Sequence, residues 1–314
     1  MSARIKAYLY LLTTCVIWGI ASPVIKYTLN YIQPFAFLFI RFLIVTLVLL
    51  PIFFVYLNKK KIKLTFKKIL KLSFLGFLGT TLGLSLLFIG YKHTTAIDGS
   101  LIYSVSPMFV IIGGALFLKE QVTKLEKVGA LLAFFGSIVT IIQPLLEGKA
   151  LALENIGGNV LVFLSAISWA VYCLMVRKIE FKDKTDPFVL TAIGFFSGLI
   201  TIIPFYLYEL YTSNDYLKTT YFSFSSLLAI NPNAIPGILY MSLISSIIAY
   251  LTYNLGYALI EASEATIFDY LKPVFAAPIA VIWLGEQITI PFLAGALLIF
   301  LGVFLTEYKP RSIM

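Results

Sequence analysis

The chain has 314 residues, of which 60% are hydrophobic and only 12% are charged. Soluble domains carry about a quarter charged residues, so this composition excludes an ordinary soluble protein and indicates an integral membrane protein. The formal net charge of +9 would suggest an acidic partner in a soluble protein, and its meaning here depends on where the basic residues lie. Two cysteines and one histidine are too few for a disulfide framework or a Cys/His metal site, so we expect no metal and no cofactor.

Ten apolar runs follow one another along the chain, and each is long enough to cross the hydrocarbon core of a bilayer as a helix of about 20 residues. They lie at 7–29, 34–57, 69–91, 97–118, 126–145, 157–177, 187–210, 234–258, 264–284 and 290–307. The first run contains Trp18 and Lys26 and has no small-residue cleavage pattern, so we expect a retained helix and not a secretory signal. The predicted fold is an all-α integral membrane protein of ten transmembrane helices.

The basic residues gather in alternate loops. The loops after the second, fourth and sixth runs, together with the two termini, hold 18 of the 24 lysines and arginines. Only Lys92, Lys149 and Lys218 lie in loops on the opposite side. Because cytoplasmic loops are enriched in Lys and Arg, we expect a multi-pass protein of the plasma membrane with both termini in the cytoplasm. The positive charge then reflects membrane topology and contact with anionic membrane lipids, and not nucleic-acid binding.

The second half of the chain repeats the first. At a constant offset of 166, the matches are Gly90-Tyr91 with Gly256-Tyr257, Ala96 with Ala262, Pro107 with Pro273, Glu120-Gln121 with Glu286-Gln287, Gly129 to Leu132 with Gly295 to Leu298, and Gly136 with Gly302. Trp18, Pro34 and Pro51 recur as Trp169, Pro187 and Pro204 at offsets of 151 to 153. We assign two five-helix repeats to residues 8–142 and 158–306. Because five is an odd number of spans, the two repeats must be inserted with opposite orientation.

Inverted repeats of this kind are a recurrent architecture of secondary transporters. The substrate site of such proteins lies near the bilayer midplane between the halves, and rocking of the halves exposes it to each side in turn. The architecture therefore predicts a carrier for a small-molecule substrate, but it does not identify that substrate. The sequence shows no nucleotide-binding domain, so we expect the energy to come from gradients or exchange.

Short motifs along the chain resemble those of EamA domains in the drug/metabolite transporter superfamily. They are Trp18-Gly19 with Lys26 in the first run, Arg41-Phe42 in the second, Pro107 followed by Leu118-Lys119-Glu120, and Pro273 followed by Leu284-Gly285-Glu286. Ten-helix members of this superfamily carry two EamA domains in tandem. The resemblance implies export or exchange of amino acids or similar small polar metabolites. One departure is Lys272, which stands where many members carry a small polar or acidic residue.

Other functions remain alternatives at this point. A carrier of nucleotide sugars, sugar phosphates or lipophilic compounds would share the same architecture. A membrane receptor that binds a ligand without moving it is disfavoured by the repeat, because inverted symmetry lets one packing exchange for its mirror state. An intramembrane enzyme is also disfavoured, since the sequence has no His-Glu-x-x-His zinc motif, no Gly-x-Ser-x-Gly elbow and no P-loop. We expect a monomer that has no nucleic-acid partner.

Charged residues inside the apolar runs are the first candidates for function, because each costs about 2.5–3.5 kcal/mol at the centre of a membrane helix. Asp269 and Lys272 are three residues apart and share a helix face. Either they line the central cavity, with Lys272 attracting a carboxylate or phosphate and Asp269 an amine or a proton, or they form a self-neutralising structural pair. Lys26 and Arg41 lie toward the outer ends of their runs. They form a gate or an anion-attracting vestibule, or else Lys26 reaches the interface and Arg41 pairs with an acid or with carbonyls.

Aromatic and amide side chains at membrane depth are further candidates for a cavity wall. Trp18 and Trp169 occupy equivalent places in the two repeats, and they either stack on substrate or pack against small residues. Tyr103, Tyr253 and Asn254 carry polar groups for which lipid offers no partner, so we expect some of them to face a wet cavity. Tyr172, Tyr250 and Tyr270 belong to the same group.

Prolines and glycines mark positions where helices bend or approach one another. Pro107 and Pro273 interrupt the fourth and ninth runs, where they either allow bending during gating or form fixed kinks. The glycine pairs of the fifth and tenth runs, 129/136 and 295/302, are expected to let helices pack closely.

Two features near helix ends complete the predictions. Glu120 and Glu286 stand at equivalent helix ends, where we expect them to anchor loops or cap helices. Loop 211–233 is long and polar-aromatic, and we expect a small external cap there.

Overall fold

The computed structural model describes residues 2–118, 123–148, 152–183, 185–213, 230–260 and 267–307. Predictions for Lys119, Glu120, Gln121, Lys149, Lys184, Lys218, Ala262, Lys309, Arg311 and residues 214–229 of loop 211–233 concern positions outside these ranges. Within the described ranges every regular element is a helix.

The helices of the first half follow the predicted runs. They are α1 (Ala3–Thr28), α2 (Pro34–Lys60), α3 (Phe66–Gly76), the π-helix η1 (Phe77–Leu82), α4 (Gly83–His93), α5 (Ala96–Tyr103), α6 (Ser106–Leu118) and α7 (Lys124–Leu146). The third run is thus built by α3, η1 and α4 together, and the fourth run by α5 and α6.

The second half repeats this order. Its helices are α8 (Ala152–Asp183), α9 (Pro187–Ser213), the short 3₁₀-helix η2 (Pro232–Ala234), α11 (Ile235–Leu239), the π-helix η3 (Tyr240–Ile248), α12 (Ala249–Tyr257), the 3₁₀-helix η4 (Ile267–Leu271), α14 (Lys272–Leu284) and α15 (Ile290–Glu307). Eight helical stretches, the last of them Pro232–Tyr257, are long and apolar enough to cross a bilayer. The ninth and tenth runs correspond to η4 with α14 and to α15, so the ten-helix, all-α prediction is confirmed over the described residues.

Local side chains explain where these helices begin. The hydroxyl groups of Ser2, Thr65 and Thr95 accept backbone N–H groups in the first turns of α1, α3 and α5. Pro34 and Pro187 are the first residues of α2 and α9, a position where the missing N–H of proline costs no hydrogen bond. Caps and prolines that are visible in the sequence therefore set the helix starts.

The two π-helices stand at equivalent places, because an offset of 166 moves η1 into the range of η3. A π-helical turn is rare and is often found at functional sites. In η1 the carbonyl of Leu78 accepts a hydrogen bond from Ser168 Oγ at 3.0 Å. In η3 the carbonyl of Ser245 accepts one from Trp18 Nε1 at 3.1 Å. In both halves a carbonyl of the π-helix thus accepts a hydrogen bond from a side chain of a neighbouring helix.

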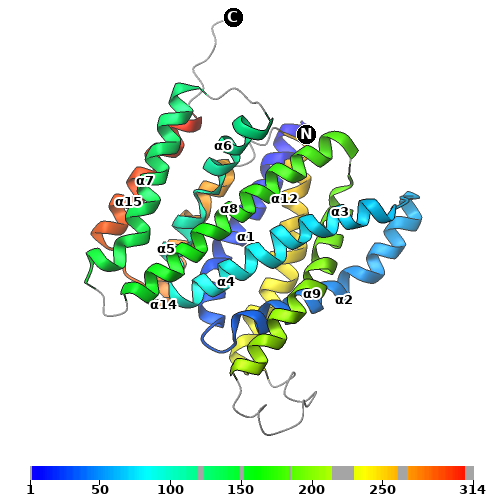
Figure 1. Cartoon of the computed structure of the whole chain (residues 1–314), viewed down its shortest axis with the longest axis horizontal. Coiled ribbons are helices and arrows are strands. Elements are labelled where there is room, and N and C mark those ends of the chain that lie inside the picture. The colour runs from blue at the N-terminus through cyan, green and yellow to red at the C-terminus, as the bar shows by residue number, and fades with distance from the viewer. Residues whose placement is uncertain are drawn as a thin grey trace, which may run out of the picture.

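Helices α7 and α15 pack antiparallel at one side of the bundle (Figure 1). A Cβ atom on Gly302 would come 2.4 Å from the carbonyl oxygen of Gly129, and one on Gly136 would come 2.8 Å from that of Gly295. Such distances leave room only for hydrogen, so these glycines allow the two backbones to touch. The predicted role of the two glycine pairs in close helix packing is confirmed. The first glycine of each pair meets the second glycine of the other pair, as expected for two helices that run in opposite directions.

Helices α2 and α9 form a second antiparallel pair at the other side of the bundle (Figure 1). The Glu209 carboxylate accepts the N–H groups of Phe35 and Ala36 at 3.0 and 2.7 Å, at the start of α2. At the start of α9, Tyr56 donates its hydroxyl proton to Asp186 at 2.8 Å. Positions 56 and 209 differ by the repeat offset of 153. Each helix therefore uses the equivalent residue near its end to hold the start of the other.

Glu286 caps a helix of the opposite half. Its carboxylate accepts the N–H groups of Ala96 and Ile97 at 2.7 and 2.9 Å, in the first turn of α5. A carboxylate at a helix N-terminus is favoured by both the hydrogen bonds and the helix dipole. The predicted capping role of Glu286 is confirmed.

Candidate functional site

A cavity of about 60 Å³ lies between the two halves. Its walls come from α1, α2, α4 and α5 of the first half, and from η3, α12 and α14 of the second. Pockets that hold metabolite-sized or drug-sized ligands usually measure about 300–1,000 Å³. The cavity in this structure is therefore narrow, and a solute of metabolite size needs it to widen.

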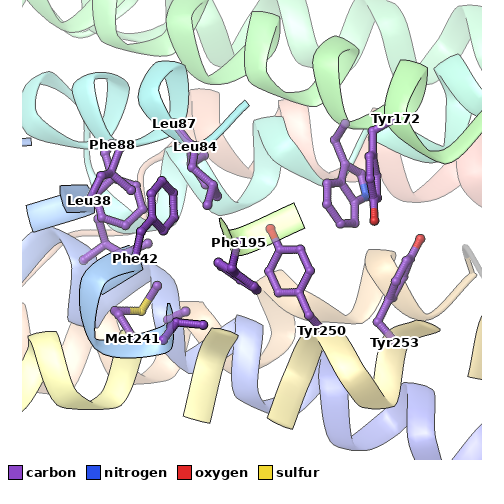
Figure 2. Packing of buried hydrophobic residues seen from close by; sticks show 14 of the residues in the cluster. Leu38, Phe42, Leu84, Leu87, Phe88, Tyr172, Phe195, Met241, Tyr250 and Tyr253 are labelled. Carbon is purple, nitrogen blue, oxygen red and sulfur yellow. The ribbon is translucent and has the colours of Figure 1, made fainter. Parts of the chain in front are cut away.

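Apolar and aromatic side chains form most of the cavity wall. Figure 2 shows Leu84, Leu87 and Phe88 of α4 on one side, with Met241 of η3 across from them. Tyr250 of α12 also borders the cavity, and its ring lies beside that of Phe195 of α9, with centroids 5.0 Å apart (Figure 2).

Arg41 is the most deeply buried charge of the site, with 1% of its surface exposed. It lies on α2 and borders the cavity. Its Nε donates to Ser246 Oγ at 2.7 Å, and its guanidinium carbon lies 5.7 Å from the centre of the Phe88 ring. Its Nη1 has no hydrogen-bond partner, and no acidic side chain among the described residues pairs with it. The acid or carbonyl partner considered from the sequence is replaced here by a serine hydroxyl, so the charge is left uncompensated.

Lys272 and Asp269 form a buried ion pair, with Nζ and Oδ1 2.7 Å apart. Lys272 is the first residue of α14 and borders the cavity, whereas Asp269 lies behind it in η4. The Lys272 ammonium is 4.5 Å from the centre of the Trp18 ring and 5.3 Å from that of Tyr103. Both rings also border the cavity, so Lys272 is held by one carboxylate and two aromatic faces.

Trp18 and Trp169, at equivalent places in the two repeats, contact each other edge to face with ring centroids 5.5 Å apart. Tyr250 and Tyr253 of α12 pack against both indoles at 5.2–5.8 Å. Only Trp18 reaches the cavity wall, whereas Trp169 is 3% exposed and packs behind it. The two tryptophans therefore form one aromatic cluster between the halves.

Three other residues singled out from the sequence lie away from the cavity wall. Lys26 donates from Nζ to the carbonyl of Lys92 at 3.3 Å. The Tyr253 hydroxyl contacts Cys173 Sγ at 3.4 Å, and Asn254 Nδ2 donates to Thr191 Oγ1 at 2.8 Å. The polar groups of Tyr253 and Asn254 are thus paired with other buried groups and do not face a wet cavity.

Pro107 and Pro273 are the second residues of α6 and α14. The chain before each proline leaves the α-helix, as a turn at 104–105 and as the 3₁₀-helix η4. In the first turn of a helix the backbone N–H groups have no partner within the helix, so a proline there costs no hydrogen bond. Each proline therefore starts a new helical segment, and it does not bend a continuous helix.

Three serines and one tyrosine of the cavity wall were not predicted from the sequence. Ser22, Ser100 and Ser245 border it, and Tyr91 donates its hydroxyl proton to Ser22 Oγ at 2.7 Å. The match of Gly90-Tyr91 with Gly256-Tyr257 in the second repeat could have indicated Tyr91 as a candidate residue. Ser245 faces the cavity from the π-helix η3, and no sequence pattern predicts such a turn.

The chain is similar to known membrane transporters over nearly its whole length. The model of the EamA-like transporter family matches twice, at residues 5–142 and 156–308. An uncharacterized transporter of Archaeoglobus fulgidus is 28% identical, over 98% of this chain and 99% of the relative. A "Probable amino-acid metabolite efflux pump" of Salmonella typhimurium is 28% identical, over 98% and 97% of the two chains. A solved structure titled "Crystal structure of protein" covers 97% of this chain with a TM-score of 0.65 at 16% identity, which supports the fold alone.

The two family matches cover the inverted halves that the helix pairs α7–α15 and α2–α9 define. Transport families of this kind are not enzyme families. The chain is a multi-pass membrane protein and belongs to the EamA-like transporter family.

Proposed function

We propose that this protein is a secondary transporter that exports or exchanges amino acids or similar small polar metabolites. The observation that carries the proposal is Arg41, a buried cation that borders a cavity between the two halves and has no acidic partner among the described residues. Removing a charge from water is unfavourable by several kcal/mol, so an unpaired one is expected to have a counter-ion at some stage of its function. A substrate carboxylate supplies that counter-ion.

The charge balance of the cavity favours an anionic group on the substrate. Asp269 neutralises Lys272 at 2.7 Å, so Arg41 carries the remaining uncompensated charge among the described residues that border the cavity. A planar guanidinium binds a carboxylate through two parallel hydrogen bonds, and such charge-assisted bonds are stronger than neutral ones. The rings of Trp18, Phe88 and Tyr250 offer an apolar wall for the rest of the solute.

The proposed movement is alternating access of the two halves. The supporting features are the equivalent breaks before Pro107 and Pro273 and the equivalent π-helices η1 and η3, all of which occur once in each half. Interruptions of membrane helices at the interface of inverted repeats are where transporters bind solutes and change shape. In this account Lys272, Trp18 and Tyr103 line the site, and Asp269, Trp169 and Tyr253 hold Lys272 and Trp18 in place. Asn254 instead joins α12 to α9 through Thr191.

Two relatives support the substrate class by name. The protein of Salmonella typhimurium named above and one of Escherichia coli, 27% identical over 96% of this chain, are both called "Probable amino-acid metabolite efflux pump". We propose further that the protein resides in the plasma membrane with both termini in the cytoplasm, on the basis of the lysine-rich alternate loops.

Counterflow in proteoliposomes tests the proposal. Vesicles that contain the purified protein are loaded with one unlabelled amino acid, and uptake of the same labelled amino acid is followed against protein-free vesicles. Sugar phosphates, nucleotide sugars and a lipophilic cation form the comparison panel. The proposal predicts accumulation of at least one amino acid class. Flux confined to another class contradicts the substrate assignment, and binding without any flux indicates a receptor.

A further inference from the structure

A groove of about 320 Å³ lies on the outer surface of the bundle, away from the cavity between the halves. Its walls are Phe53 of α2, Leu64 and Ile69 at the start of α3, and Phe196 and Ile200 of α9. Ile200 is 68% exposed, so the groove is open to the surroundings of the protein. These helices lie together on the right side of Figure 1.

The groove presents apolar groups although three hydroxyl-bearing residues border it. Ser197 Oγ donates to the carbonyl of Gly194 at 3.0 Å. Thr201 Oγ1 donates to the carbonyl of Ser197 at 2.8 Å and contacts the hydroxyl of Thr81 at 2.5 Å. Because the hydroxyl groups of Ser197 and Thr201 are occupied by these hydrogen bonds and the other groove residues except Ser73 are apolar, a hydrocarbon chain fits the groove better than a polar solute does.

One end of the groove is strongly basic. Seven lysines lie between residues 59 and 71, and residues 1–97 contain no aspartate or glutamate. Lys63 is exposed and precedes the groove residue Leu64, and Lys68 precedes the groove residue Ile69. Each basic residue near a membrane surface attracts anionic lipid by about 1 kcal/mol, or roughly fivefold in affinity.

The start of α3 adds a second reason to expect an anion. Lys67 and Lys68 stand in the first turn of this 11-residue helix, and no acidic residue accompanies them. Cations at a helix N-terminus oppose the positive end of the helix dipole, so this arrangement is unfavourable without a counter-ion. Thr65 Oγ1 accepts the N–H of Lys68 at 3.3 Å, and an anion at this place would bind the positive end of the helix.

We propose that this groove binds an anionic phospholipid. One acyl chain lies along Phe53, Phe196 and Ile200, and the phosphate lies at the start of α3 beside Lys63 and Lys68. The size of the groove, its apolar surface and the positive charges of Lys63 and Lys68 at its end together fit this one occupant. The site is separate from substrate transport, and it would fasten α2, α3 and α9 to each other through a bound lipid.

Native mass spectrometry of the detergent-purified full chain tests the site. The probes are dioleoyl phosphatidylglycerol, dioleoyl phosphatidylcholine with the same acyl chains, and inorganic phosphate. The proposal predicts that phosphatidylglycerol is retained in preference to phosphatidylcholine. It also predicts that Lys63→Gln/Lys68→Gln weakens phosphatidylglycerol binding by about 25-fold, from roughly fivefold for each lysine.

Two further variants separate this site from general attraction to charge. Ile200→Trp fills the groove and leaves every lysine in place, so it should remove the retained phosphatidylglycerol. Lys124→Gln/Lys127→Gln removes two lysines from another basic segment and should leave binding unchanged. The proposal would be overturned if the protein retained both lipids equally, or if the two lysine double variants lost phosphatidylglycerol binding equally. It would also be overturned if Ile200→Trp bound phosphatidylglycerol as wild-type protein does, or if only inorganic phosphate were bound.

Discussion

The indole rings of Trp18 and Trp169 lie 5.5 Å apart at an interplanar angle of 88°, so equivalent residues of the two repeats touch each other between the halves. Their surroundings differ in one respect. Trp18 Nε1 donates to the carbonyl of Ser245 at 3.1 Å, whereas the buried Trp169 Nε1 has no partner. This difference makes the two tryptophans a matched pair for experiment.

We expect Trp18→Phe to lower stability and transport more than Trp169→Phe does. The first change removes a hydrogen bond, worth about 1 kcal/mol, and the aromatic face that Lys272 contacts. The second change removes an N–H that has no partner, so the protein loses no hydrogen bond. Thermal unfolding midpoints and counterflow rates of the two variants measure the difference. Equal losses in both variants would show that packing alone decides their effects.

The ion pair of Asp269 and Lys272 predicts a strong coupling between two substitutions. Asp269→Asn or Lys272→Gln alone leaves a buried charge without its partner, which should destabilise the protein by about 3–5 kcal/mol. The double variant removes both charges and should recover most of that stability. Denaturation in detergent measures the coupling.

The transport rate of the same double variant separates a structural pair from a functional one. We expect low flux, because Lys272 borders the cavity and contacts Trp18 and Tyr103. Stability and flux that both return to wild-type values would mean that the pair only braces α14.

The glycine contact between α7 and α15 predicts a position-specific effect of a single methyl group. Gly302→Ala would place a Cβ atom 2.4 Å from the carbonyl oxygen of Gly129 and should cost about 1–3 kcal/mol through overpacking. Gly157→Ala in α8 meets nothing within 4 Å and should gain about 0.5–1 kcal/mol from helix propensity. Unfolding midpoints compare the two variants. A neutral Gly302→Ala would contradict close contact of the two helices.

Much of the fold follows from the sequence because hydrophobic length and repetition are strong signals. The ten apolar runs, the equivalent tryptophans and the glycine pairs each mark a helix or a contact that the structure contains. The π-helices η1 and η3 could not be predicted, because the side chains that donate to the carbonyls of Leu78 and Ser245 come from other helices.

The composition of the cavity wall was only partly predictable for a related reason. Arg41, Lys272, Trp18 and Tyr103 border the cavity, and their charge or size at membrane depth indicated them in advance. Asn254 looked equally suitable, but its amide is bound to Thr191 on another helix. Whether a polar group faces a cavity depends on which helix supplies a partner, and that is a property of the packing and not of the local sequence.

The most direct test of the account concerns the charge of Arg41. Binding of a transported amino acid is compared with binding of its carboxamide, by calorimetry on the wild-type protein and on Arg41→Gln, with Arg41→Lys as the variant that keeps the charge. A charge-assisted hydrogen bond is worth about 1.5–3 kcal/mol, so wild-type protein should prefer the acid by about 10- to 150-fold. Arg41→Gln should lose that preference, and Arg41→Lys should keep a smaller one. If Arg41→Gln binds the acid as tightly as wild-type protein does, Arg41 is not the counter-ion of the substrate.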